Sequence, residues 1–133
     1  MALLTVKDLS YENITLVYSE HTDGNGAVWV CLEFNGDMDM QDPDSIFMPY
    51  LQDLHSQMSQ NGIKKIQLDF RPLRFLNSSG IKLMVKWVQM MLILPADKVY
   101  SMEILANSSV AWQDNCLKLL SLLAPKLINI KLL

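Results

Sequence analysis

The sequence predicts a single α/β domain, with a mixed, largely parallel β-sheet, an N-terminal antiparallel hairpin and about three packed helices. Two observations lead to this prediction. Apolar and polar residues alternate in several short segments, as they do in strands, and apolar residues recur at helical spacing between those segments. The resulting order is β-β-α-β-α-β-α-β. Strands that are separated by helices imply right-handed crossovers and parallel pairing.

The composition supports one domain and argues against several classes of function. The chain has 133 residues, of which 50% are hydrophobic and 19% charged, so it can bury a core without disulfides or metal. Its net charge of −3 and the lack of a basic run give no support to nucleic-acid binding. The N-terminus does not resemble a secretory signal, and no apolar stretch is long enough to cross a membrane. The isolated cysteines Cys31 and Cys116 therefore predict a reduced, cytoplasmic protein.

The boundaries of the elements follow from apolar periodicity and from turn residues. Segments that contain glycine, asparagine and aspartate separate several elements, and prolines end two of the helices. The predicted strands cover residues 14–19, 27–34, 66–70, 99–105 and 128–132, and the predicted helices run from Asp42 to about residue 60, from Gly80 to Leu94 and from Asn107 to about Leu123.

Three of these elements carry further expectations. In the strand over residues 27–34, the odd-numbered and the even-numbered residues are both mostly apolar. This is typical of a strand that is covered on both faces at the centre of a sheet. In the first helix, Pro49 predicts that the regular part begins near Met48. The second helix is apolar nearly all round, so either a neighbouring helix covers it or part of it faces a protein partner.

The segment Asn77–Gly80 joins a strand to the second helix and is the strongest candidate for a functional site. A helix N-terminus has unpaired N–H groups and a partial positive charge, which favour an anion. A phosphoserine at Ser78 or Ser79 would add about −1.5 to −2 charges there. On the residues alone, the alternative is that Asn77 or Ser78 simply caps the helix. Four nearby cations make this the one locally basic stretch: Arg71, Arg74, Lys82 and Lys86.

This region resembles the STAS domain of anti-sigma factor antagonists and of sulfate transporter tails. Residues 66–80 are similar to the family's strand, apolar loop and Asp-Ser-Ser-Gly turn. Residues Gly36–Asp39 are similar to its acidic corner before the first helix. The resemblance covers residues 27–132 of a domain that we expect to span residues 1–133. It departs from the family at Asn77, which stands where the family has aspartate.

The resemblance implies a cytoplasmic regulatory protein that switches protein partners by phosphorylation and is not an enzyme. The second serine of the turn is phosphorylated in the antagonists, which implies phosphorylation of Ser79, with Ser78 as the second candidate. The implied partners are a serine kinase or anti-sigma-type protein and, as a further candidate, a phosphatase; a homodimer stays open. The partner-binding residues expected on this basis are Asn77, Ser78, Ser79, Gly80, Ile81, Lys82, Met84 and Asp39.

Two alternatives remain open, and other chemistry has no support in the residues. In the first, the domain binds a small anion, such as a nucleotide, through Arg71, Arg74 and Lys82. In the second, it is a scaffold that is not phosphorylated.

The histidines, His21 and His55, have no adjacent nucleophile and are expected at the surface. Histidines and cysteines are not spaced as metal ligands, so we expect no catalytic residue, no cofactor and no metal.

Overall fold

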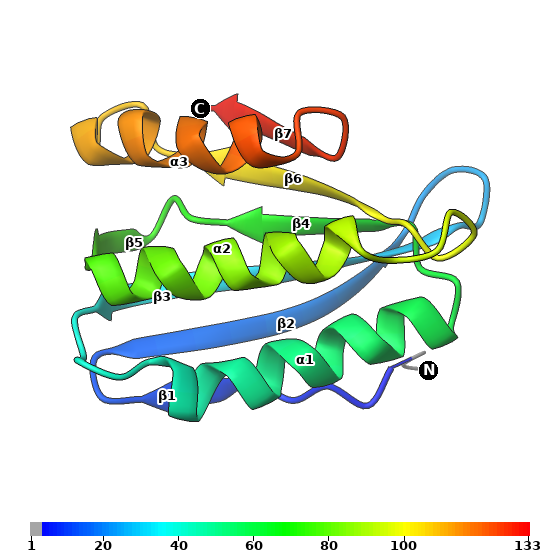
Figure 1. The fold of residues 1–133 in the computed structure, drawn as a ribbon, viewed down its shortest axis with the longest axis horizontal. Coiled ribbons are helices and arrows are strands. Elements are labelled where there is room, and N and C mark those ends of the chain that lie inside the picture. Colours follow the sequence, from blue (N-terminus) through cyan, green and yellow to red (C-terminus); the bar gives the residue numbers. More distant parts are fainter. Residues whose placement is uncertain (1–3) are drawn as a thin grey trace.

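A computed structural model describes residues 4–133, and in it the helices lie together on one face of a β-sheet (Figure 1). Helices and strands alternate along most of the chain, as the sequence predicts. The strands are β1 (Leu9–Tyr11), β2 (Ile14–Thr22), β3 (Val28–Met38), β4 (Lys65–Asp69), β5 (Leu73–Leu76), β6 (Ser101–Ala106) and β7 (Ile128–Leu132); the helices are α1 (Asp44–Gln60), α2 (Ser78–Leu92) and α3 (Ala111–Leu123).

The sheet has the order β1-β2-β3-β4-β6-β7, and β5 pairs with β3 beside this path. Strands β1, β2 and β3 are antiparallel neighbours, whereas β3, β4, β6 and β7 pair in parallel. This arrangement confirms the predicted mixed sheet and its N-terminal hairpin. The sequence does not predict β1 and β5, because three and four residues are too few to show an alternating pattern.

Strand β3 lies at the centre of the sheet, as predicted, but the prediction that both of its faces are covered is wrong. Its even-numbered residues from Val30 to Phe34 are buried beneath the helices. On the other face, Trp29 and Cys31 are only half-buried. Trp29 is shielded by side chains of the sheet itself, since its ring stacks on His21 with centroids 4.4 Å apart and Lys65 Nζ lies 5.0 Å from its centroid.

Helix α2 lies between α1 and α3, which explains why it is apolar on almost its whole circumference (Figure 1). Its residues Trp87 and Val88 are completely buried. The polar residues on its remaining side are exposed, namely Lys82, Lys86 and Gln89. Of the two explanations that the sequence offers for this helix, cover by neighbouring helices is therefore the one that the structure supports.

Helix α1 begins at Asp44 and continues through Pro49, so the predicted regular start near Met48 is wrong. Proline cannot donate to the carbonyl four residues earlier, which belongs here to Ser45. Both Pro49 and Ser45 are exposed, so water can bond that carbonyl instead. The helix consequently tolerates the proline.

Helix α3 begins at Ala111, later than predicted. The residues before it form a separate turn, in which Asn107 Oδ1 accepts from the Ser109 backbone N–H at 2.9 Å. In the first turn of α3, Gln113 is completely buried. Its Oε1 accepts from the Asn107 backbone N–H at 2.7 Å, and its Nε2 donates to the carbonyls of Phe70 and Leu73 at 2.7 and 2.8 Å. One side chain thus ties α3 to the segments that follow β4 and β6.

A hydrogen-bond chain crosses the core between the helices. Trp87 Nε1 donates to the Tyr100 hydroxyl at 2.8 Å, and this hydroxyl lies 2.6 Å from His55 Nδ1. Since Trp87 can only donate, the Tyr100 proton is free to bond the neutral His55 ring. Burial lowers the pKa of His55, which favours the same neutral form. His55 is half-buried rather than at the surface, whereas His21 is exposed as predicted.

The free energy of unfolding is expected to fall as the pH drops below about 6.5. In that range unfolded His55 binds a proton, whereas folded His55, with its lowered pKa, does so only at a lower pH; the unfolded state therefore binds more protons. Urea unfolding followed by tryptophan fluorescence at about pH 7.5 and about pH 5.5 measures the difference.

Two variants serve as controls for this pH dependence. The variant H55Q keeps an oxygen that can accept from Tyr100 but cannot take up a proton, so its dependence on pH is expected to be weaker. The variant H21Q changes an exposed histidine but also removes its stacking on Trp29, so it is compared with the wild type only for the difference in stability between the two pH values, which is expected to be the same. Equal stability of the wild type at both pH values would contradict the assignment.

Candidate functional site

The segment Asn77–Gly80 is fixed by both ends of one side-chain amide. Asn77 is the N-cap of α2, and its Oδ1 accepts from the Gly80 backbone N–H at 2.8 Å. Its Nδ2 donates to the Met40 carbonyl at 2.7 Å, and its backbone N–H donates to the Met38 carbonyl at 3.0 Å. The turn is thereby bound to the loop between β3 and α1. An aspartate would supply the acceptor but not the donor, so the fold gives asparagine a role of its own here.

Gly80 is needed because the first turn of α2 packs closely against the end of β3. A Cβ at this position would lie 2.4 Å from Leu76 Cδ1 and 2.8 Å from Met38 Sδ. Both distances are shorter than the contacts that real Cβ atoms make, so a larger residue would force the side chains of Leu76 and Met38, or α2 itself, to move. The small residues of this turn therefore also serve packing.

The two serines of the turn lie in different surroundings. Ser78 is exposed, whereas Ser79 is half-buried. Ser79 contributes to a small surface pocket of about 160 Å³ between the start of α2 and the start of α1. A phosphate on Ser79 would thus lie among lysines and aspartates, and one on Ser78 would face solvent. The pocket is lined by Gln41, Asp42, Pro43, Asp44, Ser79, Lys82 and Lys86.

Two of the three cations that were candidates for a ligand site are already paired with carboxylates. The Arg71 guanidinium makes two bonds to the Asp69 carboxylate, at 2.9 and 2.8 Å, and Arg74 pairs with Asp37 at 2.9 Å. Burial acts to raise the pKa of Asp69, but the bonds from Arg71 outweigh it and the pKa lies below its usual range. Neither arginine lines the pocket that contains Lys82. An anion site built from all three is therefore not supported.

The remaining cations of this region lie on α2 and differ in their partners. Lys86 forms an ion pair with Asp44, at the start of α1. Lys82 is exposed and makes no ion pair with any residue from 4 to 133. The locally basic stretch indicated by the sequence is therefore largely neutralised in the fold, with Lys82 as its free charge.

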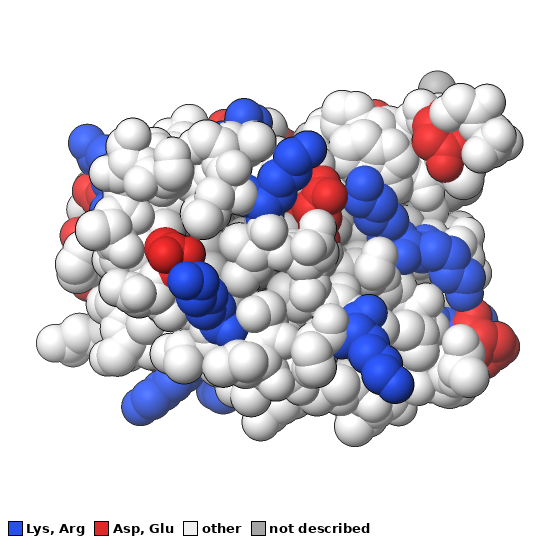
Figure 2. Space-filling view, turned by 90° about the horizontal axis from the view of Figure 1, so that it is seen from above, with Lys and Arg blue, Asp and Glu red and all other residues white. Residues whose placement is uncertain are grey.

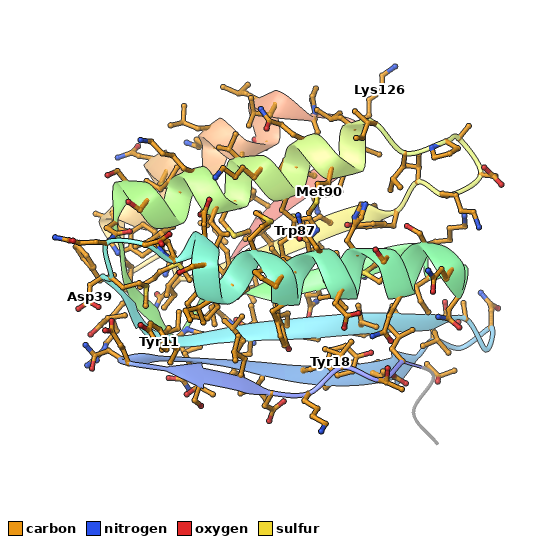
Figure 3. All side chains as sticks on the ribbon, turned by 60° about the horizontal axis from the view of Figure 1, so that its bottom comes forward. Tyr11, Tyr18, Asp39, Trp87, Met90 and Lys126 are labelled. Atoms are coloured by element: carbon orange, nitrogen blue, oxygen red, sulfur yellow. The ribbon has the colours of Figure 1, made fainter. Side chains whose placement is uncertain are left out.

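The other expected partner-binding residues divide by exposure. Asp39 is exposed and lies between Met38 and Met40, whose carbonyls hold the turn, at the end of the molecule where α1 and α2 begin (Figure 3). Ile81 is half-buried. Met84 is only 1% exposed and belongs to the core, so it cannot contact a partner in this conformation. Its position on the buried side of α2 favours the interpretation of methionine as core filler.

Within residues 4–133 there are few other groups that suggest chemistry. No group of three or more histidine, cysteine, aspartate or glutamate side chains in this range could hold a metal ion. Cys31 and Cys116 are both free, and burial raises the pKa of each thiol, that of Cys31 to about 11. No helix in the described part of the chain has the length and apolar character needed to cross a membrane.

Comparison with known proteins bears on the fold. No protein-family model and no curated protein sequence matches this chain. Among solved structures, it is similar to an anti-sigma factor antagonist from Mycobacterium paratuberculosis, with 18% sequence identity and a TM-score of 0.54 over 87% of this chain and 85% of that one. The chain has the fold of an anti-sigma factor antagonist. At this identity the likeness concerns the fold alone, and it confirms the STAS-type architecture that the turn indicates.

The variant N77D is expected to lower the free energy of unfolding by about 1 kcal/mol. Its carboxylate keeps the bond to Gly80 and gains from the helix N-terminus, but it leaves the Met40 carbonyl without a donor and beside a negative charge. Urea unfolding measures the change, and N115D, which adds the same charge at an exposed position of α3, is the control. If N77D is as stable as the wild type, the bond to Met40 contributes nothing.

The variant G80A is expected to destabilise the fold by about 1 kcal/mol, because crowding of about 1–3 kcal/mol exceeds the gain in helix propensity of about 1 kcal/mol. The matched control is G24A, because a Cβ at Gly24 meets no atom within 4 Å. Thermal unfolding of both variants measures the difference. Equal melting temperatures for G80A and G24A would show that α2 can shift without cost.

Proposed function

We propose that this protein is a cytoplasmic regulatory protein of the anti-sigma factor antagonist type, which binds a protein partner through the turn at the start of α2 and is controlled by phosphorylation there. The observation that carries the proposal is the serine turn itself. It stands at one end of an antagonist fold, is fixed by Asn77 and presents Ser78 to solvent. The two free thiols agree with a reducing compartment.

The proposed docking surface, called here the turn surface, comprises the side chains around the start of α2 that a partner can reach. Asp39 and Lys82 supply one exposed charge of each sign, and Ser78 supplies a hydroxyl that can donate and accept. A partner of the serine kinase or anti-sigma type would bind this surface when the serines are unmodified. The turn surface consists of Asp39, Asn77, Ser78, Ser79, Ile81 and Lys82.

Phosphorylation of Ser79 would change the charge of this surface. The phosphate would meet Lys82 and Lys86, but Lys86 is already paired with Asp44. The new dianion must therefore displace Asp44 from Lys86 or be repelled by it, and either event changes the pocket. Ser78 is exposed, so a phosphate there would need no such rearrangement. In both cases about −1.5 to −2 added charges would weaken docking through repulsion and desolvation.

Asparagine in place of the family's aspartate is compatible with this proposal. The first turn of α2 contains no acidic residue, and Asn77 adds no charge beside the serines. A phosphate would therefore be the one negative group within the first turn of α2, where the helix dipole favours it. Phosphorylation would therefore change the turn from neutral to negative, whereas a turn with an aspartate would be negative in both states.

The variant S79D is expected to weaken binding of the captured partner at least about tenfold, whereas S79A binds as the wild type does. The partner is first identified by affinity capture with the wild-type chain and mass spectrometry, and its affinity for each variant is then measured by calorimetry. The control is S56D, which makes the same change at an exposed position of α1.

A second measurement tests modification directly, by phosphopeptide mapping of the protein from its native cells. Phosphate on Ser79 or Ser78 is expected. The switch proposal fails if neither serine carries phosphate and if S79D, S78D and the wild type bind the partner with equal affinity.

A further inference from the structure

Strand β7 forms one edge of the sheet and presents backbone groups that no other strand of the described chain bonds. On its inner side, the Leu127 carbonyl accepts from the Met102 N–H of β6 at 2.8 Å, and the Leu133 N–H donates to the Ala106 carbonyl of β6 at 2.9 Å. Because residues alternate in direction along a parallel ladder, the N–H and C=O groups of Ile130 and Leu132 point away from the sheet. Such an edge is a template for a further strand.

The opposite edge offers much less to a further strand. Strand β1 has only three residues, and Glu12 follows it with a φ of 53°. A residue in this left-handed conformation interrupts the extended backbone that a ladder needs. Of the two edges, β7 therefore offers the longer run of free backbone groups, although its Ile128 N–H already donates to the Ala124 carbonyl at 3.0 Å.

Apolar side chains flank the β7 edge. A groove of about 330 Å³ runs between α3 and β7, and beside it Leu122 is 73% exposed and Leu132 46% exposed. Figure 2 views the molecule from the side where α3 and β7 lie and shows a mostly uncharged surface with separate charged groups. The charged residues in the groove, Asp114 and Lys118, form an ion pair with each other at 3.3 Å. The groove therefore has little net charge.

We propose that the β7 edge pairs with β7 of a second copy of this chain, antiparallel about a two-fold axis at Ile130. With this centre, all five residues of β7 overlap with all five of the second strand. The N–H and C=O groups of Ile130 face their own counterparts, and the Leu132 N–H faces the Ile128 carbonyl, while the Ile128 N–H keeps its bond to Ala124 within each chain. The result is an isologous dimer with one continuous sheet.

The side chains of β7 select this register among the neighbouring ones. A two-fold axis at Ile130 places Lys131 opposite Asn129, whereas an axis at Lys131 would place two lysines directly opposite each other. An axis at either Asn129 or Lys131 would also shorten the overlap to three residues of β7. On the helix side, Ile128, Ile130 and Leu132 meet the same apolar set of the second copy.

The second copy is the occupant that this surface fits best. The surface is complementary to itself, because apolar residues meet apolar residues and the Asp114–Lys118 pair cancels within each chain. Exposed Leu122 of α3 lines the groove and extends the apolar contact beside the strand. Strands β4 and β6 separate β7 from β3, so the turn surface stays free in such a dimer.

Cysteine cross-linking tests the register. In the proposed dimer Asn129 and Lys131 are a directly opposed, non-hydrogen-bonded pair with Cα atoms about 4.5 Å apart, within disulfide range. A mixture of N129C and K131C, carrying tags of different size, is therefore expected to form the mixed disulfide in oxidised glutathione, and each variant alone is not. Wild-type protein with its Cys31 and Cys116 is the control. Faster cross-linking of either variant alone would overturn the register.

Mass measurement by light scattering tests the dimer. At about 100 μM the wild type is expected at about twice the 15.2 kDa of the chain, and L132K at the mass of one chain. The matched control I93K changes an apolar residue that is 83% exposed at the end of α2, and it is expected to remain a dimer. A single-chain mass for the wild type overturns the proposal. Equal loss of dimer in I93K and L132K also overturns it, because the contact would then not be specific to β7.

Discussion

The placement of all three helices on one face of the sheet is the constraint on which the rest of the structure depends. It leaves each strand with a buried side beneath the helices and an open side, which is why Val30 is buried while Trp29 rests on neighbouring side chains of the sheet. It also places α2 between two other helices, so that helix must be apolar nearly all round. The start of α2 then meets the end of β3, and this contact builds the turn.

Much of this architecture could be predicted from the sequence, because periodicity and turn residues are local signals. The order of the main elements, the central position of β3 and the turn at Asn77 all follow from short stretches of sequence. The pairing of the cations could not be predicted in the same way. Arg74 meets Asp37 and Lys86 meets Asp44 only when β3 and the start of α1 come next to the turn. Sequence reasoning counts charges along the chain, but the fold pairs them across it.

Two further differences from the sequence-based expectations have the same physical origin. When α2 is considered alone, the sequence predicts that Met84 can contact a partner. The packing of the three helices instead places this side chain in the core. Gln113 gives no signal in the sequence, since a glutamine in the first turn of a helix is usually solvated. Its importance arises from backbone groups of Phe70, Leu73 and Asn107, which the fold brings together around one amide.

The Asn77 amide bonds the Gly80 N–H in α2 and the Met40 carbonyl in the preceding loop at the same time. Movement of that side chain therefore releases both segments together, as one opening event. The Gly80 amide is bonded by this side chain rather than by the helix, so its hydrogen can exchange with deuterium from solvent whenever the event occurs. The rate at which this single backbone amide exchanges thus reports how readily the turn opens, and nuclear magnetic resonance can follow it.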